Sequence, residues 1–97
     1  MPRLHCIVRG RVQGVGFRYF AQAVAARHDL RGWVRNLWGG SVETEVEGPQ
    51  EALDAYLKEM RSGPGLARVV EVDVDWPEGE ADYMDFEVRP TDFSPYA

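Results

Sequence analysis

The chain has 97 residues, the size of one domain with a small hydrophobic core, and a formal net charge of −5. Cys6 is the only cysteine, which excludes an intrachain disulfide. No apolar run approaches the length of a membrane span, and Arg9 and Arg11 interrupt any signal-peptide core. We therefore expect one domain covering residues 1–97, a cytoplasmic location and no association with a membrane.

The first half of the sequence predicts a strand, a helix and a hairpin. Residues 4–12 alternate apolar and polar side chains, as a strand does. Residues 17–28 repeat apolar side chains at the spacing of one helix face, and Asp29 after them suits a left-handed cap. Residues 31–37 and 41–47 predict two strands joined by a turn at Gly39 and Gly40.

The second half predicts a helix and two more strands. Pro49 suits the first turn of a helix over residues 50–61, and a loop rich in Gly and Pro follows at residues 62–65. Residues 67–76 and 83–89 alternate apolar and polar side chains as strands, whereas residues 90–97 have no strong pattern. Strand side chains expected in the core include Val42, Thr44, Val46, Val70, Val72, Val74 and Trp76. Those expected in water are Glu43, Glu45 and Glu47.

The predicted order βαββαβ, followed by a short C-terminal strand, is typical of a ferredoxin-like α+β sandwich. We expect a mostly antiparallel sheet with both helices on one face. Because a helix joins the strands at residues 4–12 and 31–37, these two strands run parallel and end at the same edge of the sheet. The loop after the first strand and Asn36 at the end of the second are expected to face each other, where α/β proteins commonly bind ligands.

A glycine-rich loop lies at that edge, between the first strand and the first helix. Gly14 and Gly16 can adopt φ > 0 at little cost, which lets successive backbone N–H groups point into one hollow. The helix N-terminus adds unpaired donors, and Arg18 in its first turn adds a guanidinium. These parts suit a phosphate, although similar glycine spacings also serve structural turns. The loop matches neither the Walker loop nor the dinucleotide-binding fingerprint.

The residue types at this edge limit the chemistry. They provide a guanidinium, N–H donors and a neutral amide, but no Ser-His-Asp set, Cys-His pair or carboxylate pair. Two histidines and one cysteine also do not form a metal-binding set. The available groups hold a phosphoryl group and align a water molecule without a strong base. They suffice when the leaving group is already good, as the carboxylate of an acyl phosphate is.

Two strings in this region resemble the signatures of the acylphosphatase family: GRVQGVGFR at residues 10–18 and GWVRNL at residues 32–37. The resemblance runs from Leu4 to about Val88. It implies hydrolysis of acyl phosphates to a carboxylate and inorganic phosphate by direct attack of an oriented water, without cofactor, metal or phosphoenzyme. It also implies that Arg18 binds the phosphoryl group and that Asn36 orients the water. The loop amides of the implied phosphate cradle belong to Gln13, Gly14, Val15, Gly16, Phe17 and Arg18.

Two segments depart from the family pattern. Trp38-Gly39-Gly40 replaces the more polar turn that most members have, so this turn bears on substrate preference. The tail after Arg89 is longer than in many members, and we expect that it is able to fold back toward the site. Trp38 is expected to be exposed, and Trp33 to lie in the core.

Charge is distributed unevenly along the chain. Residues 1–38 carry a net charge of +6, and residues 39–97 carry a net charge of −11. A positive cleft in an acidic protein suits a small anion better than a nucleic acid. We therefore expect an acyl phosphate and inorganic phosphate as partners, no nucleic acid, and a monomer.

Three other interpretations stay open. One is the acylphosphatase-like domain of a hydrogenase-maturation carbamoyltransferase, normally part of a much longer chain; the end of this sequence at Ala97 counts against it. Another is an RNA-binding module, which would need exposed aromatic side chains where the strand at 41–47 has glutamates. The third is a ferredoxin-like domain that binds an anion without catalysis. Taken without the motif, Asn36 suits the cap of a turn.

Overall fold

The computed structural model describes residues 1–95, and their elements follow the predicted order. The predicted tail covers residues 90–97, and its last two residues, Tyr96 and Ala97, lie outside the described residues. In the part described, no helix has the length and apolar character needed to cross a membrane. The elements are β1 (Arg3–Arg11), α1 (Phe17–Arg27), β2 (Arg31–Asn36), β3 (Val42–Glu47), α2 (Gln50–Ser62), β4 (Arg68–Asp75) and β5 (Phe86–Val88).

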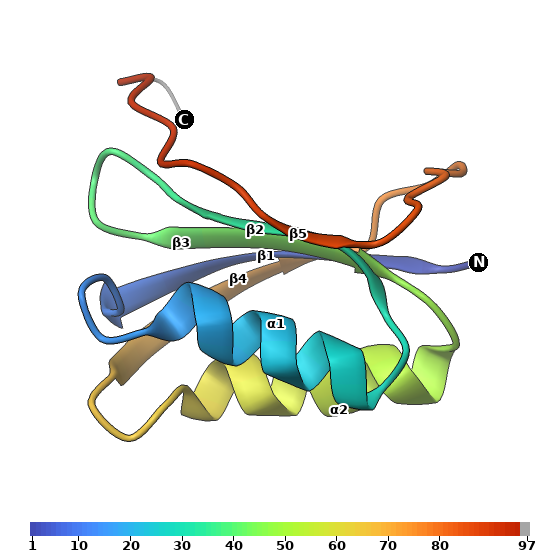
Figure 1. Ribbon diagram of the computed structural model, residues 1–97, viewed down its shortest axis with the longest axis horizontal. Coiled ribbons are helices and arrows are strands. Elements are labelled where there is room, and N and C mark those ends of the chain that lie inside the picture. Colours follow the sequence, from blue (N-terminus) through green and yellow to red (C-terminus); the bar gives the residue numbers. More distant parts are fainter. Residues whose placement is uncertain (96–97) are drawn as a thin grey trace.

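The strands form one sheet in the order β4-β1-β3-β2-β5. β3 lies at the centre and pairs antiparallel with both β1 and β2, so β1 and β2 run parallel to each other. β4 pairs antiparallel with β1, and the short β5 pairs parallel with β2. Both helices cover the same face of the sheet (Figure 1). The predicted ferredoxin-like α+β sandwich, mostly antiparallel with a short C-terminal strand, is confirmed.

The hydrophobic core fills the space between the helices and the sheet. Phe17 from α1 and Leu53, Tyr56 and Met60 from α2 are almost completely buried there. Burying each large apolar side chain stabilises the fold by about 1.5–3 kcal/mol. The Tyr56 hydroxyl shares a hydrogen bond of 2.7 Å with the Thr44 hydroxyl, so the buried polar groups are satisfied. Cys6 is also buried in this core, and burial raises the pKa of its thiol to about 12, which keeps it protonated at neutral pH.

Of the four residues predicted to be buried in or just after strand β4, two pack against the core and two are exposed. The side chains of Val70 and Trp76 are 73% and 43% exposed, whereas Val69, Val72 and Val74 pack against the core. The pairing of β1 with β4 shifts between Arg9 and Gly10, where an irregularity inserts an extra residue into β4. Such an insertion reverses which side chains face inward beyond it, so the alternation in the sequence misassigned Val70.

The face of the sheet opposite the helices is not simply exposed to water, which corrects the prediction for β3. Glu45 and Glu47 are only 9% and 6% exposed. Glu45 pairs with Arg3 at 3.3 Å and accepts a hydrogen bond from the Tyr83 hydroxyl. The backbone N–H of Tyr83 donates to Glu47 at 3.1 Å. The segment before β5 therefore returns over the open face and covers two of the three glutamates.

Candidate active site

The parallel strands β1 and β2 end at the same edge of the sheet, as predicted, and a small hollow of about 130 Å³ lies there. The β1–α1 loop, the β2–β3 turn and the C-terminal tail all gather at this end of the molecule (Figure 1). The hollow brings together the loop, the first turn of α1 and the end of β2. Its lining residues are Val12, Gly14, Gly16, Phe17, Arg18, Tyr19 and Asn36.

The loop adopts the backbone conformation that its glycines allow. Gly14 and Gly16 have φ of 74° and 78°, in the left-handed region that favours glycine. A Cβ atom at either position would meet nothing within 4 Å, so the backbone conformation, not crowding, requires glycine. Gly16 is the N-cap of α1 and offers no side chain to the helix end. Within residues 1–95, no hydrogen bond uses the backbone N–H groups between Gly14 and Tyr19. These donors suit an anion.

Arg18 lines this hollow from the first turn of α1. Its guanidinium is partly buried, and Nη1 donates a hydrogen bond of 3.1 Å to the backbone carbonyl of Arg89. A guanidinium has five N–H donors in a planar fork. One contact with a neutral carbonyl therefore holds the group in place and leaves donors and the full charge for a ligand.

Asn36 lies on the other side of the hollow, as the last residue of β2. It is opposite Val42 in the register of β2 and β3, and its backbone carbonyl accepts a hydrogen bond of 2.9 Å from the N–H of Asp92. Both neighbours hold its backbone while its side chain lines the hollow. The two predicted catalytic residues, Arg18 and Asn36, thus line one hollow although they are 18 positions apart in the sequence.

Gln13 and Val15 do not line the hollow, unlike the other four residues predicted for the cradle. The Gln13 side-chain amide donates to the carbonyls of Leu37 and Ser41 at 2.8 and 2.9 Å. It thereby ties the loop to the β2–β3 turn. Val15 packs against the hydrophobic core. Their predicted role rested on backbone amides and stays a prediction.

Val12 and Tyr19 also line the hollow, although the sequence did not predict them there. The contacts of the tail were not predicted either. The position of Tyr19 next to Arg18, in the first turn of α1, could have indicated that it lines the hollow. The tail carries no motif that could have indicated its contacts. From β5, the chain continues to Asp92, which pairs with Arg35 at 3.5 Å. The tail does fold back toward the site as far as Phe93, whose ring centroid lies 5.8 Å from that of the exposed Trp38.

Trp33 is buried as predicted, at 7% exposure, but it lies outside the core between helices and sheet. The guanidinium groups of Arg35 and Arg89 lie 5.0 and 4.8 Å from its ring centroid. Its indole N–H donates to the Tyr83 hydroxyl at 3.0 Å. Trp33 therefore anchors charged side chains and the returning segment on the open face of the sheet.

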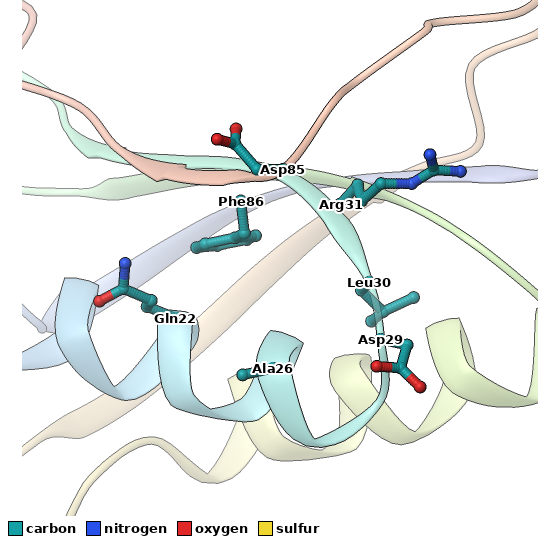
Figure 2. Close-up of a pocket in the computed structure, with 7 residues that line it drawn as sticks. All are labelled: Gln22, Ala26, Asp29, Leu30, Arg31, Asp85 and Phe86. Carbon is teal, nitrogen blue, oxygen red and sulfur yellow. The ribbon is translucent and has the colours of Figure 1, made fainter.

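A larger hollow of about 650 Å³ lies at the other end of α1, away from the glycine loop. Figure 2 shows the Phe86 ring directed toward α1, above the short side chain of Ala26. The charged residues around it are Asp29, Arg31 and Asp85. Neither predicted catalytic residue lines it. Among residues 1–95, no three His, Cys, Asp or Glu side chains are grouped as a metal site would require.

Comparisons with known proteins agree on one family. The acylphosphatase family model matches residues 4–88. An acylphosphatase of Thermus thermophilus is 51% identical over 88 residues, which is 91% of this chain and 99% of that protein. The crystal structure of acylphosphatase from Bacillus subtilis superimposes with a TM-score of 0.89 at 37% identity, covering 92% of this chain and 99% of that one. Full-length HypF, in its phosphate- and nucleotide-bound form, superimposes with a TM-score of 0.84 at 32% identity, covering 97% of this chain but 13% of that one. The chain therefore belongs to the acylphosphatase family of hydrolases.

Proposed function

We propose that the protein hydrolyses acyl phosphates by direct attack of a water molecule on phosphorus, without a metal or a phosphoenzyme. The attacking oxygen forms a bond to phosphorus, and the bond from phosphorus to the acyl oxygen breaks. The products are a carboxylate and inorganic phosphate. One observation carries the proposal: Arg18 and Asn36 line the same small hollow as the glycines at the N-terminus of α1.

In this proposal, the loop and Arg18 bind the phosphoryl group. Backbone N–H groups between Gly14 and Tyr19 have no other partner among residues 1–95, and the helix N-terminus adds a partial positive charge. Donors placed around the phosphoryl oxygens stabilise the charge that spreads over them in the transition state. The guanidinium of Arg18 adds a full charge to this set.

Asn36 has the role of orienting the water. A side-chain amide both accepts and donates hydrogen bonds, so it holds a water molecule without removing a proton from it. A strong base is unnecessary because the leaving carboxylate needs no proton. The remaining contribution is orientation, and a displacement of about 1 Å can lower the rate about a hundredfold.

The test is phosphate release from benzoyl, acetyl and carbamoyl phosphate, measured in the presence of excess chelator. We expect release from at least one of the three, with one water consumed for each bond broken. Solvent labelled with ¹⁸O then gives labelled phosphate and unlabelled carboxylate. Label in the carboxylate instead would show attack at the acyl carbon and contradict the proposal. A rate that disappears with the chelator would contradict the metal-free route.

A second candidate function is that of an acylphosphatase-like domain in a longer protein. It is favoured by the superposition of nearly the whole chain on a small part of HypF. The same site would then act on an acyl phosphate within a longer chain. A preference for carbamoyl phosphate over the other two substrates, by more than about tenfold in kcat/KM, would favour this candidate.

A further inference from the structure

Residues 89–93, which we call the tail segment, continue past β5 along the end of β2. The N–H of Arg89 donates to the carbonyl of Val34 at 2.8 Å, and the N–H of Asp92 donates to the carbonyl of Asn36 at 2.9 Å. Asp92 also forms a parallel bridge with Leu37. The match to the family model ends at residue 88, so the tail segment lies beyond it.

The tail segment contacts Arg18 directly. The carbonyl of Arg89 accepts a hydrogen bond of 3.1 Å from Nη1 of Arg18, across 71 residues of sequence. A long arginine side chain loses rotamer entropy when it is held in one conformation. A fixed carbonyl that holds the guanidinium before substrate arrives removes part of that loss from the binding step.

The tail segment also supports the backbone of Asn36. β3 pairs with one side of β2 over its whole length, whereas β5 pairs with the other side only from Gly32 to Val34. Without the N–H of Asp92, the end of β2 that carries Asn36 would be a free edge. Strand ends with few partners open locally more easily than paired strands do.

Side chains anchor the tail segment independently of any ligand. The Arg89 guanidinium lies 4.8 Å from the ring centroid of Trp33. The Asp92 carboxylate lies 3.5 Å from the Arg35 guanidinium. The ring of Phe93 packs edge-on against Trp38, with centroids 5.8 Å apart. Three separate contacts therefore hold the two groups that touch Arg18 and Asn36.

We propose that the tail segment positions both catalytic residues: Arg89 acts through Arg18, and Asp92 acts through Asn36. Neither Arg89 nor Asp92 is among the residues that line the hollow. The inference rests on the function proposed above, because it assigns Arg18 to phosphoryl binding and Asn36 to water orientation. It assigns catalytic importance to residues outside the segment that the family model matches.

Three truncated chains separate the two contacts. The chain 1–93 keeps the whole tail segment and is the control. The chain 1–90 loses Asp92 but keeps Pro90, so the carbonyl of Arg89 stays part of a peptide bond. The chain 1–88 loses both contacts. For each chain, we would measure kcat with benzoyl phosphate, the inhibition constant for inorganic phosphate, circular dichroism and the melting temperature.

The two contacts predict different kinetic losses. We expect the chain 1–93 to stay within about twofold of the full chain in both constants. The chain 1–90 should lose kcat about tenfold, because Asn36 is less well oriented, with phosphate inhibition changed less than about threefold. The chain 1–88 should in addition bind phosphate about tenfold more weakly, because Arg18 loses its partner.

A general loss of stability would give another result. If kcat and phosphate inhibition weaken in parallel with the melting temperature, and cooling restores both, the tail segment is only structural and the proposal is overturned. Equal kcat values for the chains 1–90 and 1–93 also overturn it. A full chain that hydrolyses no acyl phosphate refutes the proposed function itself, which these other outcomes leave intact.

Point variants apply where a truncated chain does not fold. Asp92→Pro removes the backbone N–H that donates to the carbonyl of Asn36. Asp92→Ala keeps that N–H and removes the carboxylate, which pairs with Arg35 and accepts a hydrogen bond from the Ser94 N–H. We expect Asp92→Pro to lower kcat about tenfold and Asp92→Ala to lower it about threefold or less. An Asp92→Pro variant with native circular dichroism and the kcat of Asp92→Ala would overturn the role given to Asp92.

Discussion

The two ends of α1 carry hollows that differ in size and in chemistry. The hollow at the C-terminal end has a volume of about 650 Å³ and is bordered by Asp29, Asp85 and Arg31. The hollow at the N-terminal end has only about 130 Å³ and contains Arg18, Asn36 and the loop glycines. A helix also presents opposite partial charges at its two ends. The smaller hollow combines positive partial charge with a guanidinium, whereas the larger has two carboxylates beside one arginine.

We infer from this difference that hydrogen-bond donors, rather than volume, distinguish the proposed anion site. At the C-terminal end of α1, the carbonyl of Ala25 already accepts N–H groups from His28 and Leu30. Ala26 and Phe86 both line the space there, from α1 and from β5 (Figure 2). At the N-terminal end, the N–H groups between Gly14 and Tyr19 have no partner within residues 1–95. Unpaired donors attract a ligand that can satisfy them.

The largest expected effect comes from removing Arg18, and Arg31 at the other hollow is its matched control. We expect Arg18→Ala to lower kcat/KM roughly a thousandfold, because it removes the charged donor from the transition state. Arg31→Ala should stay within about threefold, because its pairing with Glu47 at 4.0 Å is partly exposed. Steady-state kinetics with circular dichroism check both. An Arg18→Ala variant with near-normal activity and a native spectrum would refute the assignment of the smaller hollow.

Asn36→Ala should separate binding from chemistry at the smaller hollow. We expect kcat to fall about a hundredfold, because the attacking water loses its orientation. Phosphate inhibition should change less than about threefold, since Arg18 and the loop amides remain. Gln22→Ala at the larger hollow is the control, with neither constant changed. Weak phosphate inhibition together with an intact kcat would make Asn36 a binding residue and require another group for the water.

Gly16→Val should cost stability as well as activity. With φ of 78°, a β-branched side chain is strained there, by about 1–3 kcal/mol in the free energy of unfolding. Gly65→Val is the control, because a Cβ there also meets nothing within 4 Å and no left-handed φ is required. Urea unfolding measures both. Equal stability of the two variants would show that the loop does not need the left-handed conformation.

The last expected effect is stabilisation by inorganic phosphate, which leaves the chain unchanged. An anion that binds only the folded state should raise the free energy of unfolding by about 1–3 kcal/mol at large excess. The melting temperature of the unmodified protein and of Arg31→Ala should rise with phosphate at constant ionic strength, and that of Arg18→Ala should rise much less. An equal rise in Arg18→Ala would place the phosphate away from the smaller hollow.

Much of this architecture follows from local patterns in the sequence. Helix and strand periodicity predicted the seven elements in the right order, with ends displaced mostly by one residue and β5 shorter than expected. The left-handed conformations of Gly14, Gly16 and Asp29 were also predicted, and Asp29 has φ of 52°. Because the helix connection makes β1 and β2 parallel, Arg18 and Asn36 had to approach the same edge. These features depend on neighbouring residues and on chain connectivity, which the sequence displays directly.

Only the tertiary structure decided which partners complete the site and cover the sheet. The extra residue in β4 leaves Val70 exposed, although the alternation of apolar and polar side chains predicted it to be buried. The segment near Tyr83 covers Glu45 and Glu47, which the same alternation predicted to be in water. The contact of Arg18 with Arg89 spans 71 residues. Such contacts depend on where distant segments meet after folding. Hydrophobic periodicity reports which face of an element is apolar but not which polar group finally lies against it.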